Sequence, residues 1–242
     1  MNRRPNPSIF NWLATLLIAV LALTGCSDGS DGKGHNSPPP EALVSLAQDV
    51  SRANGGRAAI LHVTTAEGKT WEVAAGLADA NAEREAKSSD IVEIGSVSKV
   101  FLAASGENPV TMSPTLSWAA GQTLSTVADL AIFVGALYKG ELFDRAETLE
   151  LWKNQYFKPL QGEVPYGLGI MRFDLYGPEA GVFYGHDGQV LGAVALMAYH
   201  VETGDVYTAA VNNSQYRSVD SGEGGSTWEL APKLRQIADA NR

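Results

Sequence analysis

The sequence predicts an α+β fold in which helices flank an antiparallel sheet, and two observations lead to this prediction. Apolar residues recur at helical spacing near both ends of the folded part, over 42–50 and 227–240. Between them, apolar and β-branched runs separated by turn formers fill 58–75 and much of 166–213. Helix, two strands, helices, several strands and a closing helix is the order typical of a sheet covered by separate helices.

The elements follow in chain order. The first helix is expected to begin near Glu41 and to stop at Asn54-Gly55-Gly56, before a hairpin formed by 58–65 and 70–75. Thr126 and Asp129 resemble a capping box that opens a helix to about Tyr138, and a short helix is expected over 147–152. Strands are expected over 166–173, 181–184, 189–200 and 206–213, the last two joined by a turn at 202–205.

Composition excludes several classes of function. The 242 residues carry a formal charge of −9 without a basic cluster, which argues against a nucleic-acid-binding surface. The one cysteine excludes an internal disulfide framework and a cysteine-based zinc site. The four histidines are scattered, none in metal-ligand spacing with another. We therefore expect no structural metal, and the oligomeric state stays open.

The N-terminus has the pattern of a secretory signal. Arg3 and Arg4 precede an apolar stretch over about 9–23, which is short for a membrane-spanning helix and is interrupted by Asn11. The stretch ends in Leu23-Thr24-Gly25-Cys26. An ordinary signal peptide with a chance cysteine is the alternative that the pattern leaves open.

Leu23 to Cys26 resembles the lipobox of bacterial lipoproteins, in which the chain is cut before a cysteine that then carries lipid. The resemblance implies a signal peptide over 1–25 and a membrane anchor on Cys26. Residues 26–40 are rich in Ser, Gly and Pro and are expected to form a flexible tether to a domain over 41–242. The protein would then be exported and anchored in the bacterial cell envelope on the periplasmic face; Ser27 resembles an outer-membrane sorting residue.

Ser96 and Lys99 lie in the segment Ile94-Gly95-Ser96-Val97-Ser98-Lys99. Their spacing of three places both side chains on one face of a helix. A serine hydroxyl needs a base to become a good nucleophile, and a lysine whose pKa is lowered by burial can serve. The pattern alone is weak, because Ser30 to Lys33 also fits it, and a helix cap beside a surface lysine is the alternative.

A second motif, Gly185-His186-Asp187-Gly188, is expected in a loop between two strands, where a structural histidine is the alternative interpretation. Together the two motifs resemble those of the class C beta-lactamase and D-alanyl-D-alanine carboxypeptidase family, with its related esterases. The family motifs are S-x-x-K and K-T-G or H-x-G. Residues 112–130 and Tyr166-Gly167-Leu168-Gly169 also look like segments of this family.

The resemblance implies a role for each matching residue. Ser96 would be the acylated nucleophile, Lys99 its base, and His186 a group that recognises or positions the substrate. Gly188 lies in the substrate-binding motif, and the backbone N–H groups of Ser96 and Gln189 would form the oxyanion hole. The substrate would be a small molecule or a fragment derived from peptidoglycan, and no cofactor is implied.

The sequence departs from the family in one motif. No tyrosine or serine is followed two residues later by asparagine, so the family's Y-x-N motif is absent. Only a short stretch separates Phe101 from the segment that follows this motif in relatives, which predicts that most of the helical subdomain is missing. With less covering, Lys99 is expected to be hydrated and protonated, and a protonated lysine cannot act as a base.

Three hypotheses follow. The first is a lipid-anchored serine hydrolase that cleaves an amide, lactam or ester through an acyl-enzyme. The second is a non-catalytic envelope lipoprotein that keeps the fold as a binding or structural module. The third is a degraded product that folds poorly.

Overall fold

The computed structural model describes residues 37–105, 121, 123–142, 147, 158–159, 164–167, 169–174 and 176–242. The predicted signal segment, Cys26 and most of the tether lie outside the described residues, as does nearly all of the predicted helix at 147–152. Within the described part, no helix combines the length and the apolar character that crossing a membrane requires.

Within the part of the chain that the structure describes, an antiparallel sheet of eight strands forms the centre of the fold, in the order β2-β1-β12-β11-β10-β9-β8-β7. The strands are β1 (Ala59–Thr64), β2 (Thr70–Ala75), β7 (Lys158–Pro159), β8 (Pro165–Gly167), β9 (Ile170–Phe173), β10 (Phe183–Val190), β11 (Ala193–His200) and β12 (Val206–Val211). Two small pairs stand apart from it, namely β3 (Leu77–Asp79) with β4 (Arg84–Glu85) and β5 (Val92–Glu93) with β6 (Leu124–Ser125).

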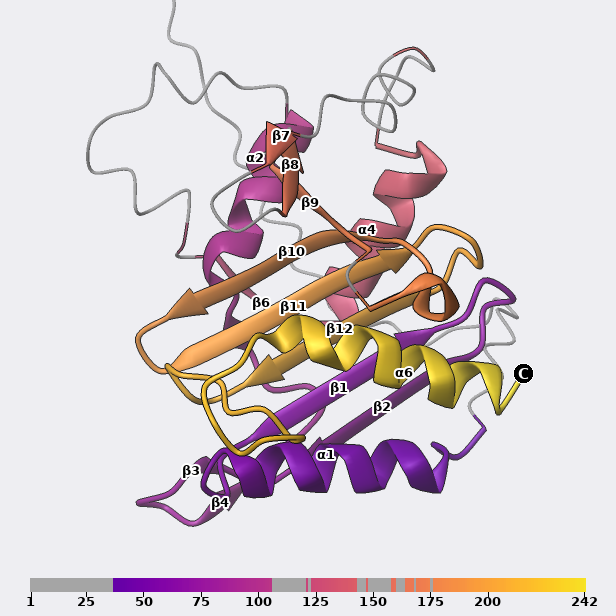
Figure 1. Cartoon of the computed structure of the whole chain (residues 1–242). Coiled ribbons are helices and arrows are strands. Elements are labelled where there is room, and N and C mark those ends of the chain that lie inside the picture. Colours follow the sequence, from indigo (N-terminus) through magenta and orange to yellow (C-terminus); the bar gives the residue numbers. More distant parts are fainter. Residues whose placement is uncertain are drawn as a thin grey trace, which may run out of the picture. The chain divides into compact units, whose positions relative to one another are not determined.

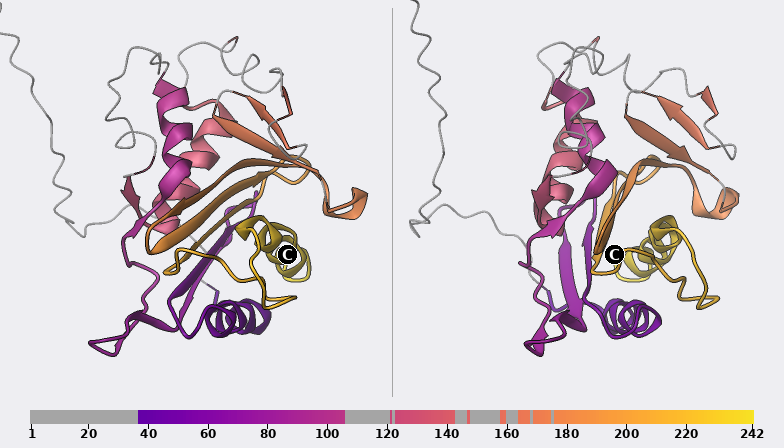
Figure 2. Two further views of the ribbon diagram at one scale, coloured as in Figure 1. Left: turned by 60° about the vertical axis from the view of Figure 1, so that its left-hand side comes forward. Right: turned by 90° about the vertical axis from the view of Figure 1, so that its left-hand side faces the viewer.

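Helices cover both faces of the sheet (Figures 1 and 2). The terminal helices α1 (Glu41–Ala53) and α6 (Leu230–Asp239) lie on one face, and α2 (Ser98–Ser105) and α4 (Val127–Lys139) lie on the other. The described residues also contain three short 3-10 helices: η1 (Gly95–Val97), η3 (Pro178–Ala180) and η4 (Thr227–Glu229). This three-layer arrangement confirms the predicted α+β class.

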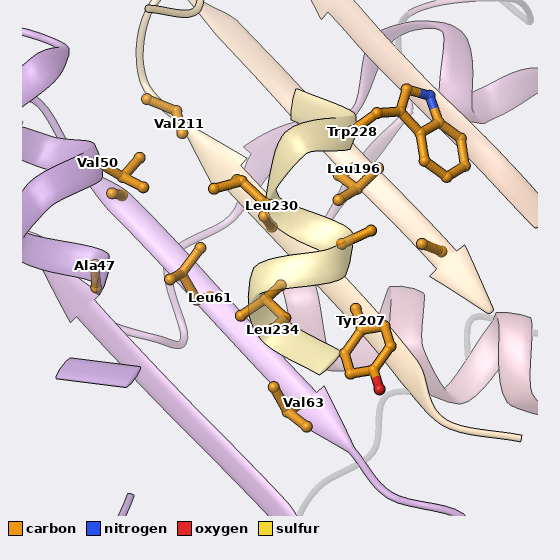
Figure 3. Close-up of a cluster of buried hydrophobic side chains, with 14 of the residues drawn as sticks. Ala47, Val50, Leu61, Val63, Leu196, Tyr207, Val211, Trp228, Leu230 and Leu234 are labelled. Atoms are coloured by element: carbon orange, nitrogen blue, oxygen red, sulfur yellow. The ribbon is translucent and has the colours of Figure 1, made fainter. Parts of the chain in front are cut away.

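The first core lies between the sheet and the terminal helices (Figure 3). Leu61 and Val63 lie two residues apart in β1, so their side chains share one face of the sheet, and they pack toward Leu230 and Leu234 of α6. Trp228 stacks on Phe173 with ring centroids 4.2 Å apart, which ties η4 to β9. All these side chains are buried.

The second core lies on the opposite face and holds the segment that carries Ser96 and Lys99. Ile94, Val97 and Val100 are fully buried against α4 and β11, where Leu130 and Met197 lie. Because residues 94, 97 and 100 recur at helical spacing, burying them directs Ser96 and Lys99 away from this core. The apolar pattern of the segment therefore orients its polar residues.

Several predicted elements are confirmed. The first helix, the hairpin of β1 and β2 and the closing helix all form. Thr126 caps α4, its hydroxyl oxygen accepting a hydrogen bond from the Asp129 backbone N–H at 3.1 Å. The predicted single strand over 166–173 is wrong in one respect, because β8 and β9 form a tight hairpin there, with Gly169 at a φ of +78° in the turn.

Candidate active site

Ser96 and Lys99 lie one turn apart at the junction of η1 and α2, on the same side, as predicted. The side-chain nitrogen of Lys99 lies 2.5 Å from the hydroxyl oxygen of Ser96, which is hydrogen-bond distance. Both residues are partly exposed, whereas Val97 and Ser98 between them are buried. The structure therefore places a hydroxyl and an amine in contact at the surface of a packed helix.

The environment of Lys99 corrects one expectation. Burial lowers the pKa of the Lys99 amine from its ordinary value, while the negative charge of Asp187 acts in the opposite direction and raises it. The expected hydration is thus only partial, since Lys99 is half-buried. A lowered pKa increases the share of neutral amine, which is the form that accepts a proton from a hydroxyl.

The segment Gly185-His186-Asp187-Gly188 lies inside β10, and the prediction of a loop there is wrong. Other backbone segments come very close to Gly185 and Gly188 of this strand. A methyl group on Gly188 would lie 1.9 Å from the Ile94 carbonyl oxygen. Such a position accepts no side chain, so glycine in this strand marks a close approach of two backbones.

Close packing of β10 on η1 brings together the two backbone N–H groups predicted for an oxyanion hole. A methyl group on Gly95 would lie 2.7 Å from the Gln189 nitrogen, and one on Gly188 would lie 2.9 Å from the Ser96 nitrogen. Gly95 also has a φ of +53°, a conformation that glycine adopts at little cost. The turn into η1 therefore depends on Gly95, and the approach of β10 depends on Gly188.

His186 is buried, with 3% of its surface exposed, and is held by two neighbours. Its Nδ1 contacts the Asp187 carbonyl oxygen, and its Nε2 lies 3.1 Å from the Tyr166 hydroxyl. The Tyr166 ring meets the imidazole edge-on. Burial lowers the pKa of His186, against the opposing influence of Asp187, and the charge of Lys99 lowers it further.

The tertiary structure thus brings Ser96, Lys99 and Gly188 together with Gln189, and places His186 within electrostatic reach of Lys99. Tyr166 and Asp187 belong to the same cluster, but the sequence interpretation gave neither a role of its own. Tyr166 stood in a recognisable segment, Tyr166-Gly167-Leu168-Gly169, yet nothing in the sequence indicated that β8 would bring its hydroxyl to His186.

Several solved structures are similar to this chain in fold. D-amino acid amidase from Ochrobactrum anthropi SV3, complexed with D-phenylalanine, has a TM-score of 0.63 at 13% sequence identity, over 83% of this chain and 99% of that chain. A D-stereospecific amidohydrolase from Streptomyces sp. has a TM-score of 0.60 at 13% identity, over 84% and 100% of the two chains. A beta-lactamase/D-alanine carboxypeptidase from Pseudomonas syringae has a TM-score of 0.60 at 10% sequence identity, over 83% of this chain and 98% of that chain.

The chain has the serine beta-lactamase-related fold. No family model matches the sequence. At identities this low the likeness establishes the fold, and the loss of a helical subdomain stays a prediction because residues 106–120 lie outside the described part. Within this fold, the residues that meet at the junction of η1 and β10 are the candidate active site.

Proposed function

We propose that the protein is a serine hydrolase that cleaves an amide, lactam or ester through an acyl-enzyme on Ser96. The observation that carries this proposal is the 2.5 Å contact between the Lys99 nitrogen and the Ser96 hydroxyl, at the place where close packing of β10 on η1 brings the backbone of Gln189 next to that of Ser96. The amidases and the carboxypeptidase that share the fold support it. Among substrate sources, the cell envelope and its peptidoglycan fragments fit the proposed location.

The reaction would proceed in two halves. Neutral Lys99 accepts the Ser96 proton while the serine oxygen attacks the carbonyl carbon, and the N–H groups of Ser96 and Gln189 donate to the oxyanion that forms. The carbon–leaving-group bond then breaks, and the leaving group takes the proton from Lys99. Lys99 then takes a proton from water, and the hydroxide attacks the acyl-serine ester. The ester C–O bond breaks, the acid is released, and the serine oxygen takes the proton back from Lys99, which restores the Ser96 hydroxyl and the neutral amine.

The test is covalent labelling and turnover. The protein should release p-nitrophenol from p-nitrophenyl acetate and react with a fluorescent penicillin, and Ser96→Ala should abolish both. Ser98→Ala is a matched control, because the buried Ser98 hydroxyl makes no hydrogen bond within the described residues. If Ser96→Ala and the wild type behave alike, the hydrolase proposal is wrong.

The absent Y-x-N motif favours a second candidate, a non-catalytic envelope lipoprotein that uses the same fold as a binding or structural module. This candidate requires a folded protein without Ser96 chemistry. Titration with soluble peptidoglycan fragments, followed by calorimetry, would detect a binding module. Turnover that depends on both Ser96 and Lys99 would exclude it.

We also propose that lipid on Cys26 anchors the protein in the cell envelope. The supporting observation is the position of the one cysteine at the end of the apolar N-terminal stretch. Expression in a bacterium fed radiolabelled palmitate should label the wild type and leave Cys26→Ser unlabelled. Equal labelling, or equal partition into detergent, would contradict the anchor.

A further inference from the structure

A groove between helix α4 and strands β1 and β2 lies apart from the candidate active site. Its volume of about 440 Å³ is within the range of roughly 300–1,000 Å³ that is typical of small-molecule sites. In the sheet order β1 lies three strands from β10, on which η1 packs. Neither Ser96 nor Lys99 is among the residues that line the groove. A ligand bound here would not touch the Ser96–Lys99 pair.

The wall that α4 contributes is apolar and built from small residues. Four of its residues are no larger than alanine and recur at helical spacing on one face of the helix, namely Ala128, Ala131, Gly135 and Ala136. Ile132 of the same face is 70% exposed. Small side chains leave the space over β1 and β2 open, so α4 offers a ligand a shallow apolar surface.

The wall that the sheet contributes is polar. His62 and Thr64 of β1 lie directly opposite Glu72 and Thr70 of β2, and all four line the groove. Residues opposite one another on paired strands lie about 5 Å apart, and residues two apart on one strand lie about 7 Å apart. The sheet therefore presents a compact array of polar side chains to the apolar wall.

Hydrogen bonds fix the proton positions in this array. A carboxylate only accepts, so the contact of His62 Nδ1 with Glu72 Oε1 at 3.1 Å places the ring proton on Nδ1. His62 Nε2 then accepts from the Thr64 hydroxyl at 2.6 Å. Burial lowers the pKa of His62 although Glu72 raises it, which keeps the ring neutral at pH 7.

The atoms that this network leaves for a ligand are acceptors. The Thr64 hydroxyl has given its proton to His62, so its oxygen can only accept. Among the described residues the second Glu72 oxygen has no partner, and the Glu72 side chain is 34% exposed. A ligand must therefore supply hydrogen-bond donors, and an anionic ligand would be repelled by Glu72. Lys139 also lines the groove and disfavours a cationic ligand.

We propose that this groove binds an uncharged sugar, whose hydroxyl groups donate to Glu72 and Thr64 while a C–H face of its ring packs on α4. A sugar ring carries hydroxyls around its rim and C–H groups on its faces, which matches acceptors opposite a shallow apolar wall. The site is additional to the proposed hydrolase, and sugar binding does not need Ser96.

Saturation-transfer NMR on the full chain tests the ligand class. The chain is purified in a polyoxyethylene detergent, which has no sugar headgroup, and the neutral probes are the methyl glycosides of glucose, galactose and mannose. At least one should bind with a Kd on the order of 1 mM, as expected for a ligand of this size. The methyl glycoside of glucuronate should bind at least about tenfold more weakly than that of glucose. The methyl glycoside of glucosamine should bind no more tightly than the best neutral probe.

Two variants locate the site. Glu72→Gln keeps the shape and removes the charged acceptor, so the Kd should rise about tenfold. Glu85→Gln is the matched control, because it removes an exposed carboxylate from β4 and should leave the Kd unchanged. Ala136→Leu fills the groove from the helix side without touching the His62 network and should abolish binding. A thermal transition like that of the wild type shows that each variant folds.

The results separate this inference from the hydrolase. Ser96→Ala should bind the sugar as the wild type does, so a protein that binds sugar but hydrolyses no ester keeps the groove proposal and loses the hydrolase. The groove proposal is overturned, and the hydrolase unaffected, if no neutral glycoside binds or only the glucosamine glycoside binds. Binding that survives both Glu72→Gln and Ala136→Leu overturns it as well.

Discussion

The Tyr166 hydroxyl donates to His186 Nε2 across 3.1 Å, although the two residues lie on strands separated by β9. Donation to this nitrogen favours the neutral imidazole, since a protonated Nε2 cannot accept. Tyr166 is therefore a positioning residue, which sets the tautomer and orientation of the ring beside Lys99.

Replacing Tyr166 with Phe removes this donor. We expect the pKa of His186 to rise toward its ordinary value of 6.5, because the neutral ring loses a hydrogen bond that favours it. Nitrogen-15 NMR of the histidine ring through a pH titration measures both tautomer and pKa. Tyr176→Phe, which removes a phenol elsewhere, should not change the His186 signal. An unchanged His186 titration in Tyr166→Phe would contradict the role given to Tyr166.

Lys99→Arg keeps the positive charge and removes the base, because a guanidinium does not lose its proton at ordinary pH. We expect ester turnover to fall by roughly 10²–10⁴-fold, the usual contribution of a general base. In the wild type the rate should rise with pH as Lys99 loses its proton, with a midpoint below 10.5 because burial lowers this pKa. A pH–rate profile for both proteins checks the prediction, and a flat wild-type profile would remove Lys99 from the role of base.

Gly188→Ala should disrupt the site through the backbone. Its methyl group would meet the Ile94 carbonyl oxygen at 1.9 Å, and forced overpacking of this kind costs about 1–3 kcal/mol or more of the free energy of unfolding. Gly135→Ala, within helix α4, is the contrasting control. Its methyl would make an ordinary 3.9 Å contact with the Val206 side chain of β12. That variant should be unchanged or up to about 1 kcal/mol more stable. Urea denaturation measures both, and equal stabilities would refute the close approach.

Acid should destabilise the fold through its buried histidines. Burial lowers the pKa of His62, His186 and His200 below the ordinary 6.5, so the unfolded chain binds protons that the folded chain does not. The free energy of unfolding should therefore be highest above pH 6.5 and fall as the pH drops through 6.5 toward the lowered values. Denaturation at pH 7.5, 6.0 and 5.0 measures this. His62→Gln should weaken the pH dependence, and a stability that rises on acidification would contradict it.

The two buried cores predict that the protein unfolds cooperatively. The third hypothesis from the sequence, a degraded product that folds poorly, predicts no cooperative transition. Leu234 of α6 is fully buried in the first core, and Leu234→Ala should cost about 2–5 kcal/mol. Calorimetry should give one sharp transition for the wild type and a lower Tm for the variant. A broad transition without a heat-absorption peak would favour the poorly folding product.

The sequence by itself determined the terminal helices, the hairpin of β1 and β2, helix α4 and the pairing of Ser96 with Lys99. Apolar periodicity predicts α1, and the cap at Thr126 predicts α4, because both signals depend on residues a few positions apart. Ser96 and Lys99 were found for the same reason, since one helical turn joins them. Local chemistry is sufficient wherever the partners are neighbours in the chain.

Only the tertiary structure decided what surrounds that pair. The segment 185–188 was expected in a loop between two strands, but it pairs with β11 as part of a strand, and its glycines admit the close approach of neighbouring backbones. Tyr166 and Asp187 join the site because sheet register, which depends on contacts far apart in the sequence, places them beside His186 and Lys99. The surroundings of Lys99 and the tautomer of the histidine follow from these long-range contacts, which no local pattern encodes.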